Sequence, residues 1–484
     1  MVIARTSNVL RRITTLLIIS CLLTVGLCVN TAAALPGSGT QEDPYRIQSL
    51  ADFDEFVGDA NYWDDYTRLE TDVNLAGRTY TTAVIAPDVN NSNWFTFDGT
   101  AFTGVFDGND HKIIGLSIDD GGAGNDYLGL FGYIEFHYSE GEVKNLGLEG
   151  GSVSGGNCVG GLVGVNHGGQ ISDCYSTGGV VGTGWYVGGL VGNYYSGSIS
   201  NSYSTGSVSG YECVGGLVGE NGGTISNSYS TGSVSGDLDV GGLVGQNGYY
   251  IMSGYQPGWI YNCYSTGSVS GRGVVGGLVG ENEYGTVSNC YSTGPVSGLD
   301  YIGGLVGYNN LGTITNCYSS GPVSGTGNYV GGLVGRNENG TVSNCYSTSS
   351  VTGTGSYVGG LVGYNYYYGD ISNCYSTGSV TGTGDSLGGL VGYNYGPISR
   401  SFWDVNTSGW TTSAGGTGKT TAEMKTKSIF TDAGWDFVEI WLINNGATYP
   451  VLRQEIRSDL NGTGGIDLLD FAVFADHWLE GTGD

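Results

Sequence analysis

The most regular feature of the sequence is a short apolar phrase, set between glycines, that returns at nearly constant spacing. Gly-Gly-Leu-Val-Gly occurs nine times within residues 151–400, and its leucines lie 26 to 29 residues apart except for one interval of 35. The longer interval holds an insertion around Tyr249–Trp259. Such a period indicates a chain built from stacked copies of one unit. The nine leucines are Leu162, Leu190, Leu217, Leu243, Leu278, Leu305, Leu333, Leu361 and Leu390.

The rest of each unit also favours β-structure. A second phrase, such as residues 286–294 (Thr-Val-Ser-Asn-Cys-Tyr-Ser-Thr-Gly), follows the first and precedes a short Val-Ser-Gly. No unit contains ten residues of helical periodicity, which argues against helical solenoids. We expect about three short strands in about 28 residues, which fits one coil of a parallel β-helix better than a propeller blade of about 40 residues. An array of β-sandwiches or a propeller remains the alternative.

The predicted fold is therefore all-β, a parallel β-helix (β-solenoid) of about ten or more coils, in which residues 128–132 form a degenerate early copy. Equivalent residues of successive coils would stack at about 4.8 Å. Leu and Val of the first phrase, with Ile or Val of the second, would form the interior stacks, although the register of neighbouring residues stays open. Repeated glycines would supply corners with positive φ.

Composition agrees with stacking, because like charges in register would repel each other. Glycine accounts for 92 of 484 residues, and residues 151–400 contain only 11 acidic and 3 basic side chains. The net charge of −28, with 16 Lys and Arg, excludes a nucleic-acid binder, since no basic surface is present to neutralise phosphates. Four His leave little material for a His-based zinc or catalytic site.

The repeated phrase resembles the GLUG motif family. Repeats of that family occur in bacterial secreted and cell-surface proteins, including regions that accompany certain immunoglobulin A proteases. The resemblance implies an exported β-solenoid. The family's repeat has no assigned catalytic residues, so the resemblance implies no activity.

Residues 1–34 have the features of a signal peptide. Arg5, Arg11 and Arg12 precede an apolar run from Ile13 to Val29, and residues 32–34 are three alanines that offer a cleavage site. The run is short for a membrane anchor, which needs about 20 apolar residues. Residues 18–21 loosely resemble a lipoprotein box. We expect a secreted or cell-surface protein with no membrane span after signal removal.

Two segments flank the repeats of residues 151–400. Residues 35–150 would form an N-terminal cap and the first coils, with a short helix over residues 50–56 that begins after Ser49 and covers the open end of the stack. Residues 401–455 change character, with Trp403, Trp410, Trp435 and Trp441, and we interpret them as the C-terminal cap.

Residues 456–484 are predicted to form a small calcium module. Oxygen-bearing side chains occupy positions 1, 3, 5, 9 and 12 of a loop, and Gly464 occupies position 6, where the loop must turn sharply. These predicted Ca²⁺ ligands are Asp459, Asn461, Thr463, Asp467 and Asp470. An acidic tail without a bound ion is the alternative.

The calcium loop and the helix predicted over residues 468–479 resemble one half of a dockerin, a module that binds cohesin domains. The resemblance implies a cohesin-like or cell-surface protein partner. The sequence departs from the dockerin pattern in two ways, because Thr463 stands where Asp is usual and only one loop–helix half is present.

Cysteines and tyrosines recur at fixed repeat positions. We expect the cysteines to be reduced and packed, although an extracellular location favours disulfides. The tyrosines that follow the Cys position are expected to stack as a ladder. A sugar-binding strip is the alternative use of tyrosine rings, with neighbouring Asn or Asp holding hydroxyl groups. The repeated cysteines are Cys174, Cys263, Cys290, Cys317, Cys345 and Cys374, and the candidate glycan contacts are Tyr308, Tyr364, Tyr366, Tyr367 and Tyr393.

No catalytic residue can be assigned from the sequence. Acidic residues in the repeats look scattered, and Gln246 occupies the coil between Glu220 and Glu281. Asp107, Asp110 and His111 are the most compact set, but Asp-Gly-Asn-Asp is typical of a turn. The leading hypothesis is a non-catalytic adhesive or glycan-contacting scaffold at the cell surface. The alternative is a polysaccharide lyase or glycoside hydrolase in a dockerin-tethered system that degrades polysaccharides.

Overall fold

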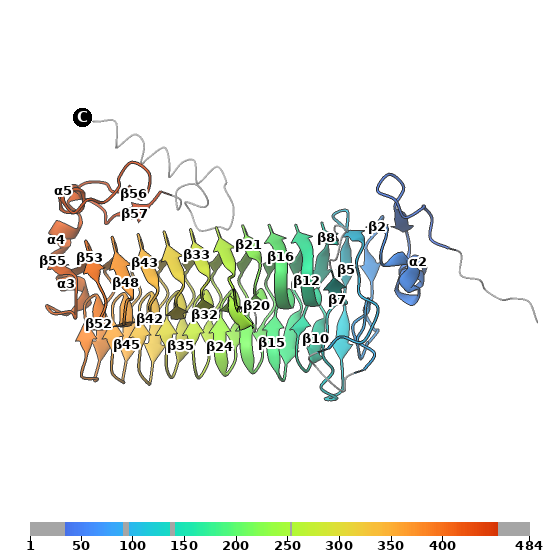
Figure 1. Ribbon diagram of the computed structural model, residues 1–484, viewed down its shortest axis with the longest axis horizontal. Coiled ribbons are helices and arrows are strands. Elements are labelled where there is room, and N and C mark those ends of the chain that lie inside the picture. Colours follow the sequence, from blue (N-terminus) through green and yellow to red (C-terminus); the bar gives the residue numbers. More distant parts are fainter. Residues whose placement is uncertain (1–33, 91–95, 136–140, 252–253, 454–484) are drawn as a thin grey trace, which may run out of the picture.

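The protein is an all-β parallel solenoid whose turns advance along a single axis (Figure 1). The computed structural model describes residues 34–90, 96–135, 141–251 and 254–453. A 9-stranded sheet contributes one strand to each of about nine full turns, slightly fewer than the ten or more predicted. The count in this sheet is lower because Leu128 of the early copy forms only an isolated bridge to Val159, although Phe131 of the same copy pairs with Val163 in the 21-stranded sheet.

A single turn shows how the repeat folds. Five strands carry each middle turn around four sheets, where three strands were predicted. The additional strands are pairs of residues, too short to stand out in a hydrophobic pattern. In one turn the strands are β36 (Ile302–Gly303), β37 (Val306–Asn310), β38 (Thr313–Thr315), β39 (Tyr318–Ser319) and β40 (Val323–Gly325). Each pairs in parallel with its counterpart in the next turn, for example Val306 with Val334.

The predicted aliphatic stacks form the interior. Leu305, Val306 and Ile314 are fully buried, as are their equivalents in the other turns except Ile398 of the last turn, which is half-buried. Two neighbours can both point inward because the chain bends there, and the N–H groups of Leu305 and Val306 both donate to the carbonyl oxygen of Leu333 at 2.9 and 3.0 Å. The bend settles the register that alternation alone left open.

The glycines of the phrase have a different role from the one predicted. In the repeats, the recurring positions with positive φ are occupied by residues other than glycine, among them asparagines such as Asn289 (φ 56°) and Asn316 (φ 53°), which tolerate this conformation. Gly303 is required for close approach, since an added Cβ would lie 1.9 Å from the carbonyl oxygen of Val306. The expectation that glycines form these corners was wrong.

An internal ladder of asparagine side chains runs along seven turns. Asn309 is fully buried, and its Nδ2 donates to Asn337 Oδ1 at 2.7 Å and to the carbonyl oxygen of Gly312 at 3.0 Å. These amides face inward, so they cannot hold sugar hydroxyls as the sequence analysis suggested. The ladder comprises Asn221, Asn247, Asn282, Asn309, Asn337, Asn365 and Asn394.

The repeated tyrosines and cysteines each form a stack. Seven tyrosine pairs from Tyr175–Tyr203 to Tyr346–Tyr375 have ring centroids 4.8 to 5.0 Å apart and nearly parallel rings. The eight cysteines of the described residues are buried and free. The N–H of Cys290 donates to Cys317 Sγ at 3.4 Å, so successive turns bond through sulfur acceptors.

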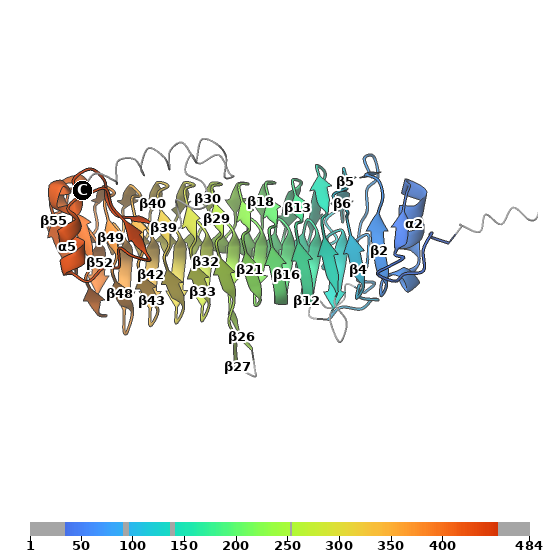
Figure 2. The same cartoon turned by 90° about the horizontal axis from the view of Figure 1, so that it is seen from above.

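The few helices lie at the two ends of the stack (Figures 1 and 2). Helix α2 (Leu50–Gly58) begins after Ser49, whose side chain accepts from the N–H of Asp52, and it buries Phe53 and Phe56. Its capping role stays a prediction. The other helices of the described residues are η1 (Ala60–Tyr62), α3 (Val405–Ser408), α4 (Thr421–Met424) and α5 (Lys427–Asp432).

Aromatic side chains join the C-terminal segment to the last turns. Trp435 and Trp441 pack with Tyr346 and Tyr375 of the tyrosine ladder. The predicted signal peptide, apart from Ala34, and the calcium module lie outside the described residues. In the described part of the chain, no helix has the length and apolar character needed to cross a bilayer.

Candidate functional site

Two columns of outward side chains form a continuous strip along the solenoid. One column follows the 21-stranded sheet, where residues of successive turns pair directly. Its members in chain order are Tyr133, Val165, Asn193, Glu220, Gln246, Glu281, Tyr308, Arg336, Tyr364 and Tyr393. We call the two columns together the outer strip.

The second column of the outer strip comes from residues with positive φ. In eight turns, a residue other than glycine has positive φ near the point where the turn enters the 9-stranded sheet. Positive φ is uncommon for bulky side chains. These residues are Tyr127, Cys158, Tyr186, Cys213, Asp239, Tyr301, Tyr329 and Tyr357. These residues contact first-column residues of the following turn. Tyr329, for example, packs on Tyr364 with 5.4 Å between the ring centroids.

The last glycine of Gly-Gly-Leu-Val-Gly allows this packing. A Cβ added to Gly280 would lie 2.6 Å from the carbonyl carbon of Asp239, and one added to Gly335 would lie 2.7 Å from that of Tyr301. The backbone of one turn therefore rests directly on the glycine of the next. The residue after the glycine, Glu281 or Arg336, is thereby placed beside the positive-φ residue.

Toward the C-terminal end, the outer strip is a platform of tyrosine rings around one guanidinium group. Arg336 lies within 6 Å of five ring centroids, from 5.2 Å to Tyr366 to 5.9 Å to Tyr301. All five predicted glycan contacts belong here: Tyr308, Tyr364, Tyr366, Tyr367 and Tyr393. The sequence analysis missed Arg336 and the rings of Tyr301, Tyr329 and Tyr357, because their positions depend on the packing between turns.

The charge of Arg336 is balanced within the platform. Its Nη2 donates to Glu338 Oε2 at 2.5 Å, and both side chains are 18% exposed. Tyr308 also donates to Glu338, at 2.7 Å. Burial and this bond to Glu338 raise the pKa of the Tyr308 hydroxyl, which stays neutral. The platform therefore presents rings and hydroxyl groups with little net charge.

The centre of the outer strip is rich in carboxyl groups. Glu220 is 4% exposed and accepts from Asn193 Nδ2 at 3.1 Å. Asp239 lies beside Glu281, and Glu212 lies close to Asp239. The sequence analysis treated these acids as scattered, because Asp239 and Glu212 sit at positions that become adjacent only when the turns stack.

These carboxyl groups lie in surroundings that disfavour charge. Burial raises the pKa of Glu220 to about 8. Burial raises the pKa of Asp239, with Glu212 and Glu283 adding to the effect, and burial with the neighbouring Asp239 raises the pKa of Glu281. No ion pair within the described ranges engages any of these acids.

The insertion in the long repeat stands beside this acidic centre. Strands β26 (Tyr249–Ile251) and β27 (Gly254–Gln256) form a hairpin that projects from the solenoid wall (Figure 2). Tyr249 packs edge-on to Tyr195 at 6.1 Å, and Tyr255 lies 3.5 Å from Tyr284 between ring centroids. The hairpin therefore borders the strip at the turns that hold the carboxyl groups.

The compact set Asp107, Asp110 and His111 is part of a turn. Asn109 and Asp110 have positive φ, and Asp107 Oδ1 accepts from the N–H of Asn109 at 2.8 Å. His111 Nδ1 lies 3.1 Å from Asp72 Oδ1. These contacts support the interpretation of the set as a turn.

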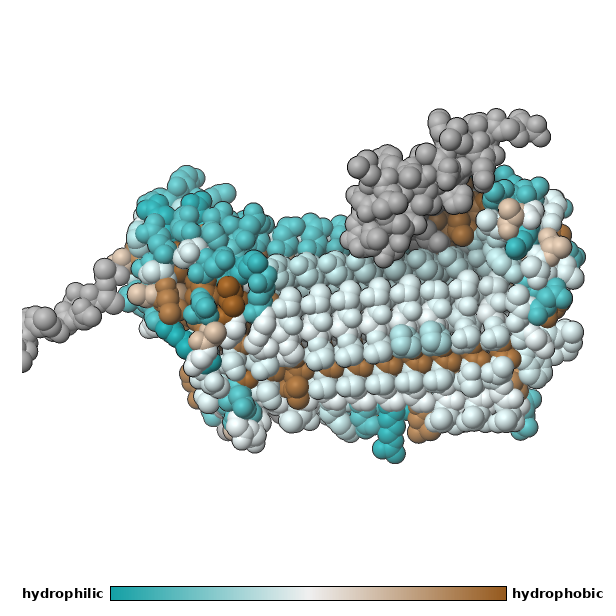
Figure 3. All heavy atoms as spheres, turned by 180° about the vertical axis from the view of Figure 1, so that it is seen from behind, coloured by the Kyte–Doolittle hydropathy of each residue, from teal (hydrophilic) through white to brown (hydrophobic). Residues whose placement is uncertain are grey.

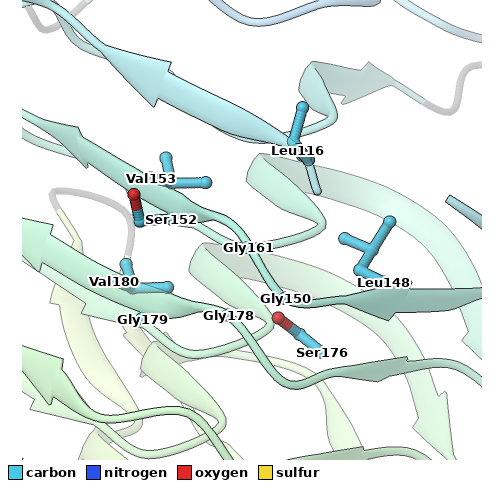
Figure 4. Close-up of a pocket in the computed structure, with 10 residues that line it drawn as sticks. All are labelled: Leu116, Leu148, Gly150, Ser152, Val153, Gly161, Ser176, Gly178, Gly179 and Val180. Atoms are coloured by element: carbon cyan, nitrogen blue, oxygen red, sulfur yellow. The ribbon is translucent and has the colours of Figure 1, made fainter. Parts of the chain in front are cut away.

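Two other surfaces offer less chemistry. The cavity in Figure 4 lies between the strands that hold Leu148, Val153 and Val180, and none of its ten lining residues is titratable. The face in Figure 3 consists of regular, weakly polar rows with a narrow hydrophobic line along the axis. A narrow line differs from the broad apolar patches that mark many docking surfaces.

Fold and strip together define a parallel β-solenoid repeat protein with an aromatic platform and an acidic centre on one outer strip. The profile of the GLUG motif matches eight segments: residues 155–181, 183–209, 210–235, 236–270, 271–297, 298–324, 326–352 and 354–381. The chain thus contains eight repeats that match the GLUG motif, and these repeats form the middle part of the β-solenoid described above.

The similarity to two curated relatives covers only a part of their length. Halomucin from Haloquadratum walsbyi is 37% identical over 142 residues, 28% of this chain and 1% of halomucin. A "Putative Gly-rich membrane protein" from Evansella cellulosilytica is 46% identical over 50 residues, 10% of this chain and 6% of that protein. The chain therefore spans only a small part of these curated relatives.

A solved structure was also found. The crystal structure of "a putative immunoglobulin A1 protease" from Bacteroides ovatus aligns over 86% of this chain and 94% of that chain, with 20% identity and a TM-score of 0.28.

Proposed function

We propose that this protein is an extracellular scaffold that binds glycans on the tyrosine platform of its outer strip. The observation that carries the proposal is the continuous array of rings around Arg336, in which Tyr301, Tyr329 and Tyr357 stack at 4.7 and 5.3 Å between centroids. The predicted signal peptide and the similarity to halomucin support an extracellular location.

The chemistry of the platform suits sugars. Tyrosine combines a flat apolar ring with a polar hydroxyl group, and it has few rotatable bonds to order on binding. Several rings are half-buried and Tyr367 is 54% exposed, so ring surface remains available to a ligand. Because Glu338 balances Arg336 and carboxyl groups fill the centre of the strip, we expect a neutral glycan to bind better than an anionic one.

A glycan array with the full chain tests this function. We expect binding to neutral polysaccharides that Tyr364→Ala and Tyr357→Ala each weaken at least about tenfold. Tyr211→Ala provides the matched control, since Tyr211 is also exposed (44%) but lies outside the platform. Binding that survives both platform variants, or no binding to any neutral glycan, would count against the proposal.

We further propose that the C-terminal module attaches the scaffold to a partner. Asp459, Asn461, Thr463, Asp467 and Asp470 would bind Ca²⁺, whose preferred ligands are oxygens, and the module would contact a cohesin-like or cell-surface protein. Calorimetry of the full chain should give calcium-binding heat at millimolar Ca²⁺ that Asp459→Ala removes. Unchanged heat in that variant would eliminate the calcium loop.

Polysaccharide cleavage is a second candidate function, favoured by the carboxyl groups beside the hairpin. A neutral carboxyl group can protonate a glycosidic oxygen while a second carboxylate activates water. Release of reducing ends from plant, algal and host glycans would support it, provided that Glu281→Gln abolishes turnover. Release that persists in this variant would place the activity elsewhere.

A further inference from the structure

Three potential metal ligands converge in the acidic centre. Glu212 and Cys213 belong to β19 (Glu212–Gly215), and Asp239 belongs to β24 (Leu238–Gly241) in the next turn. One carboxylate oxygen of each acid and the Cys213 Sγ all lie within 4.8 Å of one another. Adjacent residues of a regular strand point to opposite faces, but the positive φ of Cys213 (53°) breaks this alternation.

Cys213 stands among acids in a protected environment. Its side chain is 3% exposed, and its Sγ donates to Gln246 Oε1 at 3.3 Å. Burial raises the pKa of the Cys213 thiol, and the neighbouring carboxyl groups of Asp239 and Glu220 raise it further. Glu212 and Asp239 are half-buried, and no ion pair in the described part of the chain reaches them.

One buried amide oxygen on the same strip has no hydrogen-bond partner among the described residues. Asn193 is 1% exposed, and its Nδ2 donates to Glu220 Oε2 at 3.1 Å. Its Oδ1 has no hydrogen-bond partner among the described residues. Asn193 lies in the turn before Cys213 and pairs with Glu220, so its unpaired oxygen belongs to the acidic centre and not to the cluster around Cys213.

We propose that Glu212, Cys213 and Asp239 bind a divalent metal ion of the zinc class, with Glu281 as a further ligand. A thiolate combined with carboxylates suits Zn²⁺, whereas Ca²⁺ takes oxygen ligands only. Binding converts the thiol to a thiolate and releases its proton to solvent. The ion would neutralise the acidic centre and join two successive turns beside the hairpin.

The repeat supplies its own control cysteine. Cys158 occupies the equivalent position two turns earlier, also with positive φ (54°) and 3% exposure. It packs with Tyr127 and Val165, whereas Cys213 has Glu212 beside it in the chain and Asp239 in the next turn. A metal bound through Cys213 should therefore be insensitive to Cys158.

Titration of the full chain with Cd²⁺, which reports thiolate ligation by ultraviolet charge-transfer absorption, tests the proposal. We expect a saturable band that Zn²⁺ displaces, that Cys213→Ser removes, and that Cys158→Ser leaves unchanged. Glu212→Gln keeps the thiol and should weaken Cd²⁺ binding at least about tenfold, with unchanged circular dichroism as the folding control. A band that persists in Cys213→Ser, an equal loss in Cys158→Ser, or no band at all would overturn the proposal.

This readout is independent of glycan binding and of calcium heat. Loss of the Cd²⁺ band with intact glycan binding would refute the metal site alone. If the Cd²⁺ band is present and the glycan array shows no binding, the result would refute the glycan proposal and still support the metal site.

Discussion

The hydroxyl group of Tyr308 donates a 2.7 Å hydrogen bond to Glu338, a residue 30 positions further along the chain. The bond links consecutive turns across the face of Arg336, whose guanidinium group donates to the same carboxylate oxygen. The tyrosine platform and the ion pair therefore form one unit. The carboxylate of Glu338 orients the ring of Tyr308 and balances the charge of Arg336.

Removal of Arg336 should destabilise the platform. Arg336→Ala leaves the 18% exposed Glu338 without its cation, and we expect the free energy of unfolding to fall by about 1.5–3 kcal/mol, the range for hydrogen bonds to charged groups. Urea unfolding measures the change. Arg46→Ala, which breaks a more exposed pair with Asp43, should cost less than about 1 kcal/mol. Equal effects would contradict the prediction.

The stability of the protein should fall as pH rises above the ordinary carboxyl range. Burial raises the pKa of Glu220 from 4.5 to about 8, so between these values the folded chain retains a proton that the unfolded chain has lost. The contribution of Glu220 is complete below pH 4.5, declines by up to about 1.4 kcal/mol per pH unit, and is lost above pH 8.

Urea unfolding from pH 5 to pH 8 checks the sign of this dependence. Glu220→Gln, which stays neutral beside Asn193 and Glu283, should flatten the slope. Asp239 and Glu281 also have raised pKa values, so part of the slope should remain in this variant. Stability that rises over this pH range would contradict the assignment.

The internal asparagine ladder should be sensitive to a single break. Asn309→Ala removes the acceptor of Asn282 and the donor to Asn337. Asn337 Oδ1 is then left without its donor, at a cost of about 1–3 kcal/mol, and Asn282 Nδ2 keeps only its bond to the carbonyl oxygen of Gly285. Asn310→Ala, at a neighbouring half-buried side chain outside the ladder, should have a much smaller effect on the midpoint of urea unfolding. Similar midpoints would show that the ladder adds little.

The final glycine of the repeated phrase should not tolerate a side chain. In Gly363→Ala the new Cβ would lie 2.6 Å from the carbonyl oxygen of Gly335 and 2.7 Å from the N of Val330, so the turns must separate, at about 1–3 kcal/mol. Gly58→Ala, whose Cβ would meet nothing within 4 Å, should leave thermal stability equal or slightly higher. A neutral Gly363→Ala would refute the close-approach role.

The sequence predicted the solenoid and the main buried stacks because both follow from a repeated period. Leu305 and Val306 have counterparts in eight other turns at nearly constant spacing along the sequence. Stacking the turns is the simplest way to bury all of these side chains. The number of strands within a turn was harder to predict from the sequence, since a strand such as Tyr318–Ser319 is only two residues long. Hydrogen bonds to the turns on either side make it a strand.

One candidate site could be predicted from the repeat period, and the other could not. Tyr308, Tyr364 and Tyr393 share one repeat position, so their alignment could be predicted from the period. Asp239 and Glu281 occupy different repeat positions and consecutive turns. Their proximity depends on the positive φ of Asp239 (50°) and on its backbone resting against Gly280.

By itself, the sequence determined the repeat, the parallel stack and the aliphatic interior, because periodic hydrophobic residues can be buried together only by stacking. Tertiary structure alone decided which outward residues meet. The positive-φ residue of each turn lies beside the first-column residue of the next turn, which occupies another position of the repeat. This offset places Arg336 among tyrosines and Cys213 among acids. The physical reason is close backbone contact across glycines, which a one-dimensional period does not contain.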